Sequence, residues 1–167
     1  MTILLTGAAG FIGMHTARRL LARGDAVTGI DNLNDYYDPA LKQARLERLR
    51  PHAPFRFERL DLADRAGMEA LFAAEKFDRV IHLAAQAGVR YSLENPRAYL
   101  DSNVIGSFNV MEVARRLKVQ HLLMASTSSV YGANTAMPYA EPCGVCGGDG
   151  WISRIDVAAR MDGMRDV

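Results

Sequence analysis

The sequence predicts an α/β fold in which a doubly wound parallel sheet carries helices on both faces. Three observations predict it: apolar segments alternate with amphipathic ones, their connections are short, and a glycine-rich turn follows the first apolar segment. The order βαβαβαβαβ with short connections favours parallel strands joined by right-handed crossovers. Ligands of such sheets bind beyond the carboxyl ends of the strands.

A glycine-rich turn joins the first strand to the first helix. The apolar run 3–5 precedes glycines at positions 7, 10 and 13, and the amphipathic run 11–21 begins within that pattern. Gly7 can take backbone angles closed to other residues, Gly10 lets a pyrophosphate approach the main chain, and Gly13 lets helix and strand pack closely. The helix start adds free N–H groups and a positive dipole end. We expect dinucleotide binding here, and a glycine-rich packing turn is the alternative.

A second strand, predicted at residues 26–30, ends at Asp31. Asp31 follows Gly13 by 18 residues, close to the spacing at which an acidic residue meets the adenosine ribose of a dinucleotide. A carboxylate at that place accepts hydrogen bonds from ribose hydroxyls and repels a 2′-phosphate. The expected cofactor is therefore NAD rather than NADP.

Apolar runs predict three further strands, at residues 55–60, 80–85 and 121–125. The run 80–85 is continuously apolar, which is typical of a central parallel strand covered on both faces. The strand ends would bring one set of residues to a single edge of the sheet: Gly7, Asp31, Asp61, Ala84, Ala85 and residues 126–129. We expect one ligand site at that edge.

Helices are predicted between these strands. Pro39 opens one helix, Asp64 caps the next, and a long helix spans about residues 97–117. The buried side of the long helix is expected to consist of Tyr99, Val104, Phe108, Met111 and Val113.

The composition narrows the class of protein. With 167 residues, 49% hydrophobic and 23% charged, the chain has the make-up of a soluble globular domain. A net charge of +1 gives no reason to expect nucleic acid or an anionic membrane as a partner. No run is long and apolar enough for a membrane span, and the N-terminus lacks the basic region of a signal peptide. Two cysteines indicate no disulfide framework, so the expected location is the cytoplasm.

Several strings, in chain order, resemble the extended short-chain dehydrogenase/reductases, the NAD-dependent epimerase/dehydratase family with a Rossmann-like fold. The strings are TGAAGFIG at 6–13, DNLNDYYD at 31–38, DL at 61–62, HLAAQAGVRYS at 82–92 and STSSVYG at 126–132. DNLNDYYD and AQAGVRYS are most similar to the UDP-glucuronate 4-epimerases of that family. The resemblance covers about residues 1–142.

The resemblance implies a set of cofactor-binding residues. Those implied to hold the pyrophosphate are Gly7, Gly10, Phe11, Ile12 and Gly13. Those implied to border the adenosine are Asp31 and Asn32 at the ribose and Asp61 and Leu62 at the adenine. Those implied to line the nicotinamide side are Leu83, Ala84 and Ala85, with Asn103 facing the cofactor from the long helix. A helix-surface asparagine is the alternative for Asn103.

The resemblance also implies a reaction. In this family a tyrosine of a Tyr-x-x-x-Lys motif takes the proton of the sugar O4 while NAD takes hydride from C4, and hydride returns to the other face of the 4-keto sugar. Thr127 is implied to share the O4 hydrogen bond, and Tyr131 is implied to be structural. The substrate would be a UDP-sugar, UDP-glucuronate above others.

Substrate contacts follow from two segments. Thr127, Ser128 and Ser129 would donate hydrogen bonds to a uronate carboxylate, and a solvated Ser/Thr turn is the alternative. Arg90 would face an anionic sugar or diphosphate, or be an exposed loop arginine. Dehydratases of the family carry a carboxylate pair where Ser128 and Ser129 stand, so an epimerase is favoured over a dehydratase, and a dehydratase or reductase of the family is the alternative.

The resemblance stops after residue 142. We expect residues 1–142 to form the NAD-binding domain and residues 143–167 to be a tail unlike the family, through a frameshift or a truncation. No tyrosine follows Tyr139 and no lysine follows Lys118, so the Tyr-x-x-x-Lys pair is missing. Cys143 and Cys146 lack a second ligand pair, and no metal is expected.

Two hypotheses therefore remain open. One is the cofactor-binding half of a sugar-nucleotide 4-epimerase, poorly active alone. The other is a non-catalytic NAD-binding module or remnant. A homodimer formed through helix 97–117 is a further expectation.

Overall fold

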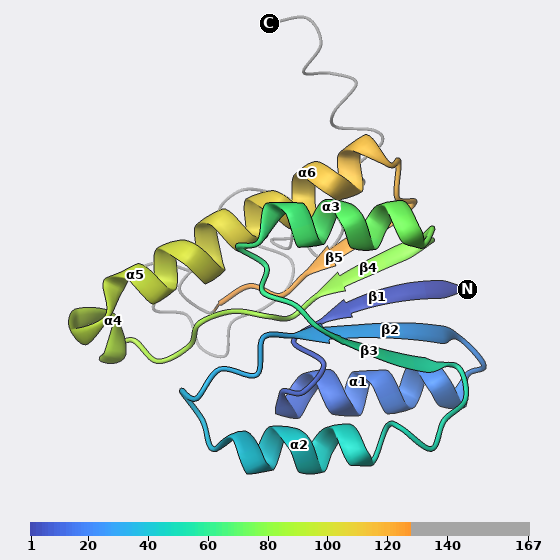
Figure 1. Cartoon of the computed structure of the whole chain (residues 1–167), viewed down its shortest axis with the longest axis horizontal. Helices are drawn as coiled ribbons and strands as arrows, with labels where there is room; N and C mark the ends of the chain where they lie inside the picture. The colour runs from blue at the N-terminus through green and yellow to red at the C-terminus, as the bar shows by residue number, and fades with distance from the viewer. Residues whose placement is uncertain (128–167) are drawn as a thin grey trace, which may run out of the picture.

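The computed structural model describes residues 1–127. Within them a five-stranded parallel sheet lies between two layers of helices (Figure 1). The strands are β1 (Thr2–Thr6), β2 (Ala26–Asp31), β3 (Phe55–Arg59), β4 (Arg79–His82) and β5 (His121–Met124). Their order is β3-β2-β1-β4-β5, and every neighbouring pair is parallel. The predicted doubly wound sheet is confirmed, with the strand order reversing between β1 and β4.

The helices divide between the two faces of the sheet. On one face lie α1 (Phe11–Ala22) and α2 (Pro39–Glu47), and on the other lie α3 (Arg65–Ala74) and α6 (Ser107–Arg116) (Figure 1). Two short helices, α4 (Tyr91–Glu94) and α5 (Pro96–Tyr99), lead through the π-helix η1 (Leu100–Gly106) into α6. From β1 the chain proceeds first to β2 and β3 on one side, and then to β4 and β5 on the other side. Because both sets of crossovers are right-handed, their helices lie on opposite faces of the sheet.

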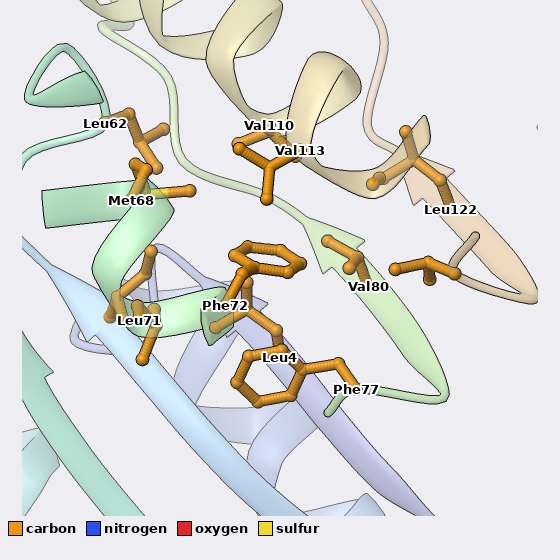
Figure 2. Packing of buried hydrophobic residues seen from close by; sticks show 13 residues of the cluster. Leu4, Leu62, Met68, Leu71, Phe72, Phe77, Val80, Val110, Val113 and Leu122 are labelled. Atoms are coloured by element: carbon orange, nitrogen blue, oxygen red, sulfur yellow. The ribbon is translucent and has the colours of Figure 1, made fainter. Parts of the chain in front are cut away.

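Both faces of the central strands are buried, as the apolar runs predict. Leu4 on β1 faces α3 and α6, whereas its neighbours Ile3 and Leu5 face α1 and α2. Figure 2 shows the first of these two cores. There the rings of Phe72 and Phe77 pack edge to face, with centroids 5.1 Å apart.

Two side-chain caps fix where helices begin. The Asp64 carboxylate accepts a hydrogen bond from Gly67 N at 3.0 Å, so the predicted cap of α3 is confirmed. Asp38 accepts from Ala40 N at 2.8 Å just before Pro39, which opens α2 as expected. Each carboxylate satisfies an N–H group that has no partner within its helix.

Strand β4 ends earlier than its apolar run predicts. It stops at His82, and the expectation of a strand through residue 85 is wrong. The reason lies in Thr6, whose hydroxyl accepts hydrogen bonds from Leu83 N at 3.1 Å and Ala84 N at 3.0 Å. Because these two N–H groups donate to the Thr6 side chain and not to a neighbouring strand, residues 83–85 do not continue β4.

The long helix has a different buried face from the one expected. Val104 and Phe108 are both 59% exposed, so their placement in the core is wrong, whereas Val113 is buried. The π-helix η1 inserts one extra residue in a turn and rotates the face that follows it. The residues that α6 buries are therefore Asn109, Val110, Val113 and Ala114.

Glycines at positions 7 and 13 allow two close approaches of the main chain. A Cβ atom on Gly13 would lie 2.0 Å from Gly7 O. Gly7 itself has φ +72° in the left-handed region, and a Cβ there would lie 3.0 Å from Ala84 Cα. Both roles expected of these glycines are thus visible in the backbone.

Replacing Gly13 by alanine should lower the free energy of unfolding by about 3 kcal/mol or more, because helix α1 must move off the turn. Gly24→Ala is the matched control, since a Cβ there meets nothing within 4 Å and costs about 1 kcal/mol for its positive φ. Urea unfolding of both variants measures the difference. Equal losses would contradict the close packing of Gly13 on Gly7.

Candidate functional site

A pocket opens at the carboxyl edge of the sheet, where the turn after β1, the loop after β2 and the segment after β4 meet. The pocket has a volume of about 150 Å³ and is partly open to solvent. The residues expected at the cofactor that line it are Gly7, Gly10, Asp31, Asn32, Asp61, Leu62, Leu83, Ala84 and Ala85. Residues after β1, β2, β3 and β4 therefore converge as predicted, whereas Ser126 and Thr127, after β5, do not line the pocket.

Other expected residues lie elsewhere. Phe11 and Ile12, with side chains 65% and 66% exposed, face outward from α1 beside His15. Only their main-chain N–H groups remain candidates for pyrophosphate contact. Arg90 is exposed and, like Thr127, is not among the described residues that line the pocket. Ser128, Ser129, Tyr131, Cys143, Cys146 and the boundary at residue 142 lie outside the described residues.

The Asp31 carboxylate is fixed at the end of β2 by three groups. It accepts hydrogen bonds from Ala9 N at 3.2 Å and Leu33 N at 2.9 Å, and Lys42 Nζ lies 3.8 Å from it. Nearby, Asn32 Nδ2 donates to Asp61 Oδ2 at 2.9 Å. The ends of β2 and β3 therefore present a connected row of polar groups to the pocket.

Lys42 is a pocket residue that the sequence analysis missed. Its ammonium is buried on α2 and donates to Asn34 Oδ1 at 2.7 Å. The signal was present, because Lys42 precedes the buried Leu46 and Leu49 at spacings of four and seven residues. A charged residue on the apolar stripe of a helix indicates a partner inside the fold. The partner here is the loop that carries Asp31.

Tyrosines connect that loop to the helices beyond β4. Tyr36 and Tyr37 line the pocket, and the ring of Tyr36 lies 4.7 Å from the rings of both Tyr37 and Tyr91. Tyr91 in turn lies 6.3 Å from Tyr99, whose hydroxyl donates to Ala87 O at 2.9 Å. These contacts join loop 32–38 to α4 and α5 at one side of the pocket.

Asn103, expected to face the cofactor, lies against the segment after β4 and hydrogen-bonds to its main chain. Its Oδ1 accepts from Gln86 N at 2.7 Å and its Nδ2 donates to Gln86 O at 3.0 Å. One side-chain amide thus pairs with both polar groups of a single residue. Asn103 contacts the pocket wall through Gln86, which itself lines the pocket.

Beneath the pocket, His82 is 4% exposed and bonded on both ring nitrogens. Nδ1 lies 2.8 Å from Thr6 Oγ1, and Nε2 lies 3.1 Å from Ser107 Oγ. Burial lowers the pKa of His82 to about 4. The ring is therefore neutral at neutral pH.

Two further observations concern residues 1–127. No three histidine, cysteine, aspartate or glutamate side chains in this part of the chain gather closely enough to hold a metal ion. None of the helices described in it has both the length and the apolar character required to cross a membrane.

This architecture defines a class: a Rossmann-like α/β domain with a glycine turn after its first strand and a carboxylate after its second, the arrangement typical of dinucleotide binding. A family model described as GDP-mannose 4,6 dehydratase matches residues 4–143. The chain belongs to that enzyme family, which confirms the resemblance to NAD-dependent epimerases and dehydratases.

Individual proteins are also similar to this chain in sequence. The chain is 58% identical over 140 residues to an uncharacterized 37.6 kDa protein of Escherichia coli O111:H-, and 84% of the chain matches 42% of that relative. It is 48% identical over 141 residues to a probable UDP-glucuronate 4-epimerase of Rhizobium meliloti, with 84% and 41% covered.

Among solved structures, a mutant UDP-glucuronic acid 4-epimerase from Bacillus cereus, in complex with UDP-4-deoxy-4-fluoro-glucuronic acid and NAD, superposes with a TM-score of 0.75. The sequence identity is 34%, and the match covers 81% of this chain and 43% of that one. The chain thus spans about two fifths of the length of these relatives.

The burial of His82 predicts a loss of stability in mild acid. In the folded state its pKa is about 4, below the ordinary value of 6.5, so the unfolded state binds the proton more readily. This contribution is complete above pH 6.5 and is lost as pH falls toward 4, about 3 kcal/mol in all. His82→Gln should remove that part of the pH dependence in urea unfolding between pH 7 and pH 4. An unchanged slope in the variant would contradict a buried neutral histidine.

Proposed function

We propose that this chain forms the NAD-binding half of a sugar-nucleotide 4-epimerase that interconverts UDP-glucuronate and UDP-galacturonate. The observation that carries the proposal is the pocket itself, where the glycine turn, Asp31 and residues 83–85 meet at the point of strand reversal. Relatives named as UDP-glucuronate 4-epimerases, and a solved one that holds NAD, support the substrate and the cofactor.

The residues of the pocket fit NAD. Gly10 precedes α1 and offers no side chain to cap the first N–H groups of that helix, which leaves them for a diphosphate. Asp31 offers a carboxylate to the adenosine ribose, and Asp61 and Leu62 border the place for adenine. Leu83, Ala84 and Ala85 line the opposite side of the pocket, where the nicotinamide ribose would lie.

When bound, NAD supplies a reversible hydride acceptor for the sugar C4. The chain's own residues would bind the diphosphate, orient the ribose and exclude water from the wall formed by residues 83–85. Thr127, three residues beyond β5, would share the hydrogen bond of the sugar O4. Ser128 and Ser129 would donate to the uronate carboxylate, and Arg90 would face the anionic substrate.

A non-catalytic NAD-binding module is the second candidate, favoured by one observation. The family resemblance implies that a Tyr-x-x-x-Lys pair moves the O4 proton, and no such string stands in this sequence. Loss of a general acid–base group lowers a rate by about 10²–10⁴-fold. The two candidates share the cofactor site and differ in turnover.

A second copy of the chain is the proposed partner for the outer face of the long helix. Leu100, Val104 and Phe108 lie at spacings of four residues across η1 and α6, and each is more than half exposed. A single apolar stripe of this kind can pair with itself about a two-fold axis. The face that η1 turns away from the sheet would then be buried in a homodimer.

The cofactor proposal predicts the effect of Asp31→Asn on NADH binding. Losing the charge should weaken binding by about tenfold to a hundredfold, since hydrogen bonds to charged groups contribute 1.5–3 kcal/mol. It should also reduce discrimination against NADPH. Asp35→Asn is the matched control, because Asp35 is an exposed carboxylate of the loop that follows Asp31. Fluorescence titration measures both, and equal affinity in the two variants would refute the role of Asp31.

Turnover separates the two candidate functions. Incubation of the full chain with NAD and UDP-glucuronate should give UDP-galacturonate at a rate at least about 10²-fold below that of a relative with the Tyr-x-x-x-Lys pair. Chromatography of the nucleotide sugars measures the product. Complete absence of product with intact NAD binding favours the non-catalytic module, and a full rate would contradict the need for that pair.

The dimer proposal predicts that Phe108→Asp converts the chain to a monomer, because a carboxylate would enter the apolar contact between the copies. Leu41→Asp is the control, since Leu41 on α2 is 52% exposed and lies on another helix. Light scattering after size exclusion gives the mass of each species. A monomeric parent chain, or a dimer that survives Phe108→Asp, would rule out this interface.

A further inference from the structure

Residues 83–85, the cofactor-side segment, have left the sheet and yet form a wall of the pocket. Two of their N–H groups, those of Leu83 and Ala84, donate to Thr6 Oγ1 at 3.1 and 3.0 Å. One hydroxyl on β1 therefore replaces the acceptors that a neighbouring strand would have provided. The position of the cofactor-side segment depends on that hydroxyl.

Counting lone pairs fixes the direction of the remaining hydrogen bonds. A threonine hydroxyl has two acceptor sites and one hydrogen. Both acceptor sites of Thr6 are used by the cofactor-side segment, so its hydrogen goes to His82 Nδ1, 2.8 Å away. A neutral imidazole that accepts at Nδ1 carries its hydrogen on Nε2, which then donates to Ser107 Oγ at 3.1 Å. The chain of donors runs from Thr6 through His82 to Ser107.

This chain of hydrogen bonds lies in the interior. Thr6 is fully buried and His82 almost so, and a buried polar group without a partner is costly. Ser107 is the first residue of α6, immediately after η1. The network thus joins β1, β4 and α6 below the pocket, and the described residues that line the pocket include none of its three side chains.

We propose that Thr6 is a positioning residue for the dinucleotide, with Ser107 acting on it through His82 in its Nε2–H tautomer. The inference rests on the proposed NAD site. Thr6 holds the main chain of the cofactor-side segment in place, and Gly7 next to it packs on Ala84 Cα. Releasing the two N–H groups lets the wall shift toward the space that the nicotinamide ribose would occupy.

NADH titration of the full chain tests this role. Thr6→Val keeps the shape of the side chain and removes the hydroxyl, and it should raise the Kd for NADH about tenfold. Thr6→Ser restores the hydroxyl and should bind within about twofold of the parent chain. Ser107→Ala should raise the Kd about threefold, because His82 then loses its acceptor but Thr6 stays bonded.

Thr28→Val is the matched control. Thr28 is buried on β2, and its hydroxyl donates to Glu75 Oε2 at 2.8 Å, away from the pocket. The variant should lose stability to a similar extent and bind NADH like the parent chain. If Thr28→Val weakens binding as much as Thr6→Val, the effect is a general loss of stability and the positioning role is refuted.

Nuclear magnetic resonance gives a readout that needs no cofactor. In the parent chain the His82 ring nitrogens should show an unprotonated Nδ1 and a protonated Nε2 at pH 7. The amide hydrogens of Leu83 and Ala84 should be protected from exchange in the parent chain and in Thr6→Ser, and exchange faster in Thr6→Val. A protonated Nδ1, or unprotected amides in the parent chain, would overturn the network.

The outcomes separate the two levels of inference. If the parent chain binds no NADH, the proposed function fails and the positioning role fails with it, whatever the state of the amides. If the parent chain binds and a folded Thr6→Val binds equally well, only the positioning role fails. If Thr6→Val does not fold, the tautomer of His82 and the affinity of Ser107→Ala decide, and a wild-type affinity in that variant counts against the proposal.

Discussion

Where β1 and β4 end, main chain packs directly on main chain, and this contact determines the rest of the site. The turn at Gly7 touches Ala84 on one side and α1 at Gly13 on the other, with no room for a side chain at either contact. At Gly7 and Gly10 the pocket is therefore lined by main chain alone. Rigid backbone is suited to a ligand such as a diphosphate, which is held by N–H groups and needs a close approach.

The two sides of the pocket differ in chemistry. On the side formed by the ends of β2 and β3, Asp31 and Asp61 form a charged row that Lys42 and Asn32 complete. On the other side, residues 83–85 present apolar side chains, and the main chain that carries them is held from below by Thr6 and at its end by Asn103. One end of the pocket is therefore charged and the other apolar, because different elements supply the two sides.

Much of this arrangement follows from local sequence. Apolar runs predict the strands, Asp64 and Pro39 predict helix starts, and the distance of Asp31 from Gly13 along the chain predicts that Asp31 lies at the pocket. The errors have two causes, an interaction between distant residues and a local change of helix type. Thr6 ends β4 from 77 residues away along the chain, and η1 changes the phase of a helix whose sequence shows an unbroken period. A buried and paired Lys42 could have been predicted, because a charged residue at a buried position of a helix needs a partner inside the fold.

The π-helix η1 lets one continuous helix, η1 followed by α6, make contacts with two different parts of the protein. Within η1, Asn103 pairs with Gln86, and after it, in α6, Asn109 donates to Leu62 O at 2.7 Å. Deleting a single residue from η1 would turn the downstream half by about 100°, carrying Asn109 away from Leu62 and bringing Phe108 toward the sheet. The extra residue thus sets which side chains of α6 face the sheet. Without it, the Phe108 ring would face inward in place of the Asn109 amide.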